Sequence, residues 1–196
     1  MVWIKCCIDT CDNLIAIRKK DVKLFKLGYK HAFCKDCQNV ENQIWKKARK
    51  ENGPVIQEKT EVTAYKGIEI CKLPTYQNHR HIFSVKKLID ALGRIPYRYI
   101  VGLHSIELAP PKYAVETAWG GKYYPDKRIR LFSQHKQRIL PSKKGKREAE
   151  YILVHEIGHY NQHRKIGCKF ENINNDIKER YANKFAGRII EKFFKN

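Results

Sequence analysis

The sequence has no long apolar run: nowhere do its residues approach the roughly 18–20 consecutive apolar positions that a membrane-spanning helix requires. Its first residues, MVWIKCCIDTCDN, also lack the basic start and the apolar stretch of a secretory signal peptide. We therefore expect a protein without membrane contact that stays in the cytoplasm. The sequence contains no internal repeat either.

Acidic residues are scarce, since 20 Asp and Glu stand against 40 Lys and Arg for a formal net charge of +20. This excess favours a polyanionic or acidic partner, so the basic N-terminal and middle regions could contact nucleic acid. The alternative is an ordinary solvated, Lys-rich surface. The hydrophobic share of 42% is enough for a packed core and argues against wholesale disorder.

Cysteine, in contrast, is well represented, with seven residues. In a cytoplasmic chain this number argues for metal binding rather than disulfides. Four of them form two closely spaced pairs, Cys7 with Cys11 and Cys34 with Cys37. Two thiolate pairs make a tetrahedral structural zinc site, although Cys6 could replace Cys7 and free buried thiols are the alternative. We expect residues 1–53 to form a four-cysteine zinc-ribbon or treble-clef-like module, because so small a unit often needs a metal for stability.

Gly53–Pro54 predicts a domain boundary. We expect the rest of the chain, residues 54–196, to form a second domain of helices and strands. We expect a helix before this boundary, over 36–50, and a hairpin within 58–73 that turns at Lys66–Gly67. A short helix should follow, capped by Ser84 and ending near Leu92. Further strands are expected over 97–108, 113–119 and 128–132, and helices over 147–165 and from Asn174 onward. This order predicts an α+β fold.

The segment YILVHEIGHY carries the motif H-E-x-x-H on an amphipathic helix. Residues four apart share one helix face, so His155 and His159 can direct ring nitrogens at one zinc ion. Glu156 is rotated off that direction and can serve as the general base that activates water. Gly158 is unfavourable in a helix, which is easier to explain if another element approaches closely. Two surface histidines on a polar helix face are the alternative reading.

A catalytic zinc needs a third protein ligand, and the candidates downstream are carboxylates and one histidine. His163 is four residues beyond His159, but it would point past an ion held by the first pair. Glu179 lies on a helix whose neighbouring stripe is small, with alanines at 182 and 186. That helix can pack closely and deliver its carboxylate, which favours Glu179 over Glu171 or Asp176.

With these residues, HEIGHY followed by ERYANKFAGRII resembles the ImmA/IrrE-type metallopeptidases, also called the M78 group. Their pattern falls here on His155, Glu156 and His159, then on Glu179 and Asn183. The resemblance covers about residues 147–190. It implies a small zincin-like domain with zinc ligands His155, His159 and Glu179, and Glu156 as the catalytic base. It also implies an edge strand above the metal, for which 128–132 is suited, and a transcriptional repressor as protein substrate.

Two other functions remain open. An SprT-like DNA-associated protease also combines H-E-x-x-H with a zinc ribbon, but it normally uses a third histidine and places the ribbon after the catalytic domain. A DNA-binding regulator with a non-catalytic peptidase-like fold is the other, although it would not need the base Glu156. No role is predicted for Cys71 or Cys168. The oxyanion-stabilising residue is left open among His79, His81, His104, His135, Tyr123 and Tyr124.

Overall fold

The computed structural model describes residues 2–5, 14–17, 43, 46–50, 53, 55, 60–111, 120–135 and 143–194. The chain forms two compact units, Met1–Ala48 and Arg49–Asn196. In the first unit, β1 (Val2–Lys5) and β2 (Leu14–Ile17) pair in antiparallel fashion. The cysteines of the expected zinc module, Cys6, Cys7, Cys11, Cys34 and Cys37, lie outside the described residues, so that module stays a prediction. The expected strand over 113–119 also lies outside them.

The second unit is built on a five-stranded mixed sheet. In spatial order its strands are β3 (Glu61–Tyr65), β4 (Ile68–Lys72), β6 (Ser105–Ala109), β8 (Arg128–Phe132) and β7 (Gly121–Tyr124). The central three strands are parallel, whereas β3 and β7 run antiparallel to their neighbours. A smaller sheet pairs β5 (His79–Arg80) with β9 (Gln134–His135).

The hairpin predicted within 58–73 is confirmed as β3 and β4. Its two turn residues, Lys66 and Gly67, both have positive φ angles, of 49° and 81°. Positive φ at both central positions is the geometry of a tight hairpin turn whose twist matches the strands. The strand predicted over 97–108 is wrong in its first half, because Tyr97–Tyr99 form the 3₁₀ turn η2 and the strand begins only at Ser105. Gly102, with φ of 82°, bends the chain between the two.

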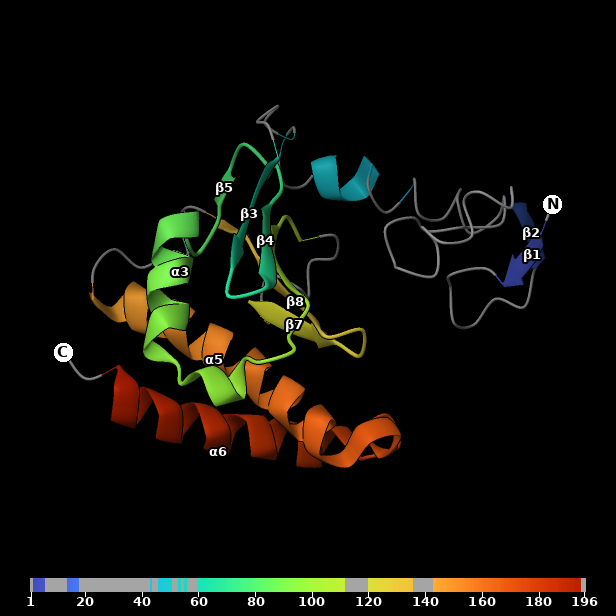
Figure 1. Cartoon of the computed structure of the whole chain (residues 1–196). Coiled ribbons are helices and arrows are strands. Elements are labelled where there is room, and N and C mark those ends of the chain that lie inside the picture. The colour runs from blue at the N-terminus through green and yellow to red at the C-terminus, as the bar shows by residue number, and fades with distance from the viewer. Residues whose placement is uncertain are drawn as a thin grey trace. The chain divides into compact units, whose positions relative to one another are not determined.

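Three helices lie on one side of this sheet (Figure 1). They are α3 (Val85–Arg94), α5 (Lys143–Ile166) and α6 (Asn175–Phe193). The predicted caps are confirmed: the Ser84 hydroxyl accepts from the Lys87 N–H and the Asn174 side chain from the Asp176 N–H. Buried side chains of the sheet and all three helices form one apolar core, and the α+β class is therefore confirmed.

The apolar spacing of α6 predicts that Ile177, Tyr181, Phe185 and Ile189 are all buried, and for Ile177 this prediction is wrong. Ile177 is 53% exposed, although Phe185 and Ile189 on the same helix are buried. Steps of four residues advance about 40° beyond a full turn, so two steps turn the side chain by about 80°. Ile177 has therefore rotated out of the stripe that faces the core.

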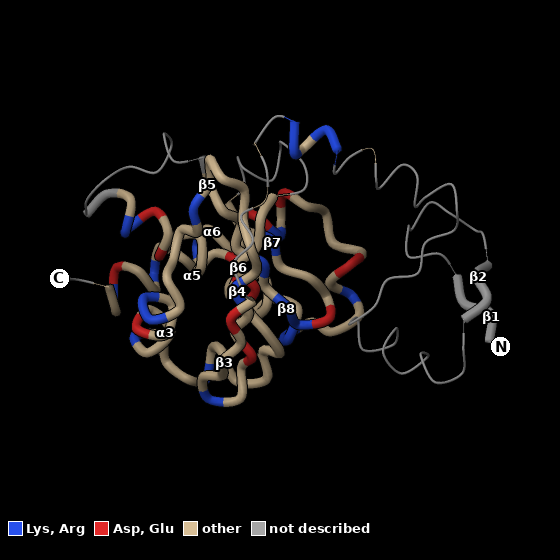
Figure 2. Tube along the Cα trace, turned by 90° about the horizontal axis from the view of Figure 1, so that it is seen from above, with Lys and Arg blue, Asp and Glu red and all other residues tan. Residues whose placement is uncertain are grey.

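Charged residues of both signs occur together on the strands of the sheet (Figure 2). Glu107 on β6, for example, accepts hydrogen bonds from Arg128 and from Arg130 on β8, at 3.2 and 2.8 Å. The sheet surface is thus locally neutralised. In the described part of the chain, no helix combines the length and the apolar character that crossing a bilayer would require.

Candidate metal centre

The helix α5 carries the first half of the candidate site. His155 and His159 project from the same side of this helix, and the hydrogen-bond distance between their Nε2 atoms is 3.1 Å. Glu156 turns away from them into the interior and is 5% exposed. The one-turn spacing of the motif thus separates two possible ligands from a buried carboxylate, as the sequence predicts.

The helix α6 brings a carboxylate to the two histidines. Glu179 Oε2 lies 3.1 Å from His155 Nε2, and Glu179 Oε1 lies 3.3 Å from His159 Nε2. Among the described residues, these three form the one group whose geometry suits a metal ion, with ligand atoms within 4.8 Å of one another. Ligand atoms around a tetrahedral zinc with bonds of roughly 2.0–2.1 Å are about 3.3 Å apart. The spacing in this chain fits such an ion.

The other candidate ligands lie apart from this group. His163 Nδ1 is 2.6 Å from the Tyr123 hydroxyl, and its ring stacks on Phe170. Glu171 borders the same cleft without joining the three ligands, and Asp176 is an exposed residue in the first turn of α6. Geometry therefore favours Glu179 as the third ligand, in agreement with the prediction from the small side chains of Ala182 and Ala186.

A second layer of polar contacts orients His155. Its Nδ1 lies 3.0 Å from Asn183 Oδ1, which also accepts a hydrogen bond from the Tyr151 hydroxyl at 2.9 Å. An amide oxygen can only accept, so this contact assigns the His155 proton to Nδ1 and leaves the Nε2 lone pair directed at the candidate ion. Tyr151 was missed from the sequence, although its position four residues before His155 places both on one helix face.

Gly158 allows the two helices to approach closely enough for this arrangement. A Cβ atom at this position would lie 2.9 Å from Ala182 Cα and 3.3 Å from Ala182 Cβ. Both distances are too short for a carbon pair, and the first involves backbone that cannot turn away. The glycine and the alanine together therefore set the separation of α5 and α6, and with it the reach of Glu179.

We expect Gly158→Ala to lower the free energy of unfolding by about 1–3 kcal/mol, because the added methyl group overpacks the helix contact. Gly187→Ala is the matched control on α6, since a Cβ there meets nothing within 4 Å. That change should raise stability by about 1 kcal/mol through helix propensity alone. Denaturant unfolding of both variants and of the unaltered chain checks this. If Gly158→Ala were as stable as Gly187→Ala, the close contact of the two helices would have no effect on stability.

The strand β7 lies beside the buried carboxylate. A Cβ on Gly121 would stand 2.9 Å from Glu156 Cγ, and the Tyr123 backbone N–H donates to the Glu156 carboxylate. The expectation that 128–132 is the edge strand is wrong: β8 lies between β6 and β7, and β7 ends the sheet as described. The sequence did not reveal β7, because this strand begins at Gly121, the second residue of a Gly–Gly pair that is typical of a turn.

Burial controls the electrostatics of the site. It raises the pKa of Glu156 to about 8, with a further upward contribution from the Glu179 charge, against smaller downward effects of the Tyr123 N–H and Lys122. Burial also lowers the pKa of His159 to about 4, and the neighbouring His155 ring and the positive charge of Lys178 act in the same direction. His159 is therefore neutral near pH 7, the form in which an imidazole binds metal.

An open cleft of about 810 Å³ surrounds these groups. Besides the residues already described, Lys122 and Lys178 line it, and neither was singled out from the sequence. Of the six side chains considered for oxyanion stabilisation, the cleft includes Tyr123, whose hydroxyl is engaged with His163. His79 and His81 instead contact backbone carbonyls of Ser133 and Leu73.

Comparison with known proteins gives no relative. No family model, no curated protein and no solved structure matches the chain.

Proposed function

We propose that the chain is a zinc-dependent endopeptidase of the ImmA/IrrE type, with a zincin-like catalytic domain. The observation that carries this proposal is the convergence of two imidazole Nε2 atoms and a carboxylate at 3.1–3.3 Å. Three acceptor groups directed at one point repel each other unless a cation or a shared proton lies between them. Nitrogen and carboxylate ligands with one position left open are typical of catalytic zinc.

Zinc in this position would polarise a peptide carbonyl and lower the pKa of water to about 7. Glu156 would then act as general base: its carboxylate would take the proton of the attacking water and transfer it to the leaving amide nitrogen. The buried, hydrogen-bonded setting of Glu156 supports this role, because the Tyr123 N–H fixes the carboxylate and burial makes it a stronger base than an exposed glutamate. Asn183 and Tyr151 act through His155, whose ring they orient.

The position of β7 supports an extended polypeptide substrate. It ends the sheet in the described part of the chain and passes directly beside Glu156 through Gly121. A substrate strand paired with such an edge would present its peptide bond to the cleft. The glutamate at the third ligand position supports the ImmA/IrrE reading over an SprT-like protease, in which a histidine is usual.

By the same resemblance, we propose a DNA-bound transcriptional regulator as the substrate, acted on in the cytoplasm. The basic N-terminal and middle regions would then contribute nucleic-acid contacts. We further propose that Cys7, Cys11, Cys34 and Cys37 hold a second, structural zinc ion. Metal content should accordingly reach about two zinc ions per chain.

The test joins metal content to cleavage. Purified full-length chain is analysed for zinc, then incubated with an extract of the cells that produce it, and new protein N-termini are identified by mass spectrometry. We expect cleavage products that disappear when a chelator is present and return when zinc is restored. A chain that retains no zinc after dialysis, or one whose products are indifferent to chelation, would refute the proposal.

A further inference from the structure

A second cavity lies between η2, the C-terminal half of α5 and α6. Its volume is about 330 Å³, at the lower end of the range for small-molecule sites. It shares no lining residue with the cleft around His155 and Glu179. No role in the proposed peptidase chemistry accounts for it.

The charge of this cavity has one sign. Five basic side chains line it, and no acidic residue does: Arg98, Arg164, Lys165, Arg188 and Lys192. In the described part of the chain, none of the five forms an ion pair. Gathered like charges repel each other and raise the local positive potential, which an anion would neutralise. On the sheet, by comparison, Glu107 neutralises two arginines.

Helix ends explain only part of this gathering. Arg164 and Lys165 lie in the last turn of α5, and Lys192 lies in the last turn of α6, where cations stabilise the terminal carbonyls. Arg98 belongs to η2, and Arg188 precedes the last turn of α6. Their convergence on the same cavity therefore needs another explanation.

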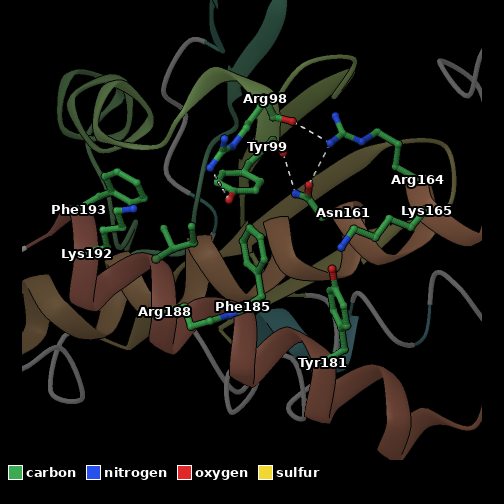
Figure 3. A pocket seen from close by; sticks show the side chains of 11 residues that line it. Arg98, Tyr99, Asn161, Arg164, Lys165, Tyr181, Phe185, Arg188, Lys192 and Phe193 are labelled. Atoms are coloured by element: carbon green, nitrogen blue, oxygen red, sulfur yellow. Dashed lines mark hydrogen bonds between the residues drawn. The ribbon is translucent and has the colours of Figure 1, made fainter.

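One wall of the cavity is fixed by hydrogen bonds to backbone. Arg164 Nη2 donates to the Arg98 carbonyl at 2.7 Å, and Asn161 Nδ2 donates to the Tyr99 carbonyl at 2.7 Å (Figure 3). Asn161 is 2% exposed, so the donor of this hydrogen bond lies in the protein interior. A wall held in this way does not have to be ordered when a ligand binds, which favours affinity.

Aromatic rings form the remaining surface. The rings of Tyr99 and Phe185 meet edge to face with centroids 5.2 Å apart, and Tyr181 lies under the Lys165 ammonium group (Figure 3). Phe193 lies beside Lys192 in the same way. The lysine side chains over the Tyr181 and Phe193 rings are flexible, so a planar heterocycle can displace them and stack on these faces, whereas guanidinium and ammonium groups suit phosphate oxygens.

We propose that this cavity binds a mononucleotide, with its phosphate at the basic side chains and its base against the aromatic rings. The cavity volume, the single sign of charge and the rings together select this class over a purely inorganic anion. This site is distinct from the metal centre, and its existence does not depend on the proposed peptidase activity.

The test is calorimetric titration of the full-length protein, prepared without added zinc, with AMP, GMP, UMP and CMP, each against its unphosphorylated nucleoside and against inorganic phosphate. We expect saturable binding of at least one nucleotide, at least about tenfold tighter than either its nucleoside or phosphate, since charged hydrogen bonds carry such differences. Equal binding of nucleotide and phosphate would overturn the proposal, as would the absence of saturable nucleotide binding. Tight binding of a single-stranded oligonucleotide without any mononucleotide binding would overturn it in favour of nucleic acid.

Variants localise the binding. Lys192→Ala and Arg188→Ala should each weaken nucleotide affinity by about tenfold. Lys184→Ala is the matched control, because Lys184 is exposed on the same helix and does not line the cavity. An equal loss in all three variants would show a nonspecific charge effect and would refute the site. Both cavity side chains are exposed, so these changes should leave folding intact.

Discussion

Replacing Glu156 by glutamine should abolish cleavage while leaving the zinc content unchanged. The amide has the size of the carboxylate and can still accept the Tyr123 N–H, but it cannot take a proton from water. General-base catalysis contributes about 10²–10⁴-fold, so we expect a loss of at least this order in the rate of product formation. The measurement is the yield of new N-termini in cell extract, together with zinc analysis of the purified variant.

Glu148→Gln is the control for this change, because it makes the same substitution at an exposed position of the same helix. It should cleave like the unaltered chain. Cleavage by Glu156→Gln at the rate of this control would remove the base from the mechanism. Retained zinc combined with lost cleavage would also separate the enzyme from a regulator that uses the fold only for binding.

Replacing Glu179 by alanine should release the metal from the site. The remaining ligands would be two histidines, which α6 no longer completes. Loss of a residue that only orients a ligand typically costs about 10–100-fold in metal affinity, so loss of the ligand itself should exceed about 100-fold. We expect zinc content after dialysis to fall by about one equivalent, with the N-terminal module unaffected.

Glu171→Ala provides the comparison, since Glu171 lines the same cleft but stands outside the ligand group. It should keep its full zinc content. If Glu171→Ala lost zinc while Glu179→Ala kept it, the assignment of Glu179 as the third ligand would be wrong. The assignment of the two histidines would not be affected.

Much of the site could be predicted because it depends on local helical geometry. The spacing of His155 and His159 fixes a shared helix face, and the small residues near Glu179 predict close packing of α6. The structure gives this packing a specific cause in the contact between Gly158 and Ala182. These features need only residues within two consecutive helices.

Features that depend on distant segments could not be predicted in the same way. The position of β7 as the terminal strand follows from its pairing with β8, and a four-residue strand that begins with a glycine gives little periodicity. Residues 97–104 indicate a strand because β-branched and aromatic residues are frequent there, yet Pro96 and Gly102 permit a tight turn instead. The basic residues of the second cavity come from η2, α5 and α6, so the sequence of no single element predicts that they lie together.

The close contact of α5 and α6 has a consequence for how the chain refolds. All three candidate ligands belong to neighbouring helices, so their contacts have a shorter sequence separation than the pairing of the parallel strands β4 and β6. The parallel pairing of β4 with β6 must instead close a segment that includes α3. Contacts of smaller sequence separation form faster on average. We therefore expect the three ligands to meet before β4 and β6 pair, so that a metal ion can bind the partly folded chain and stabilise the two helices.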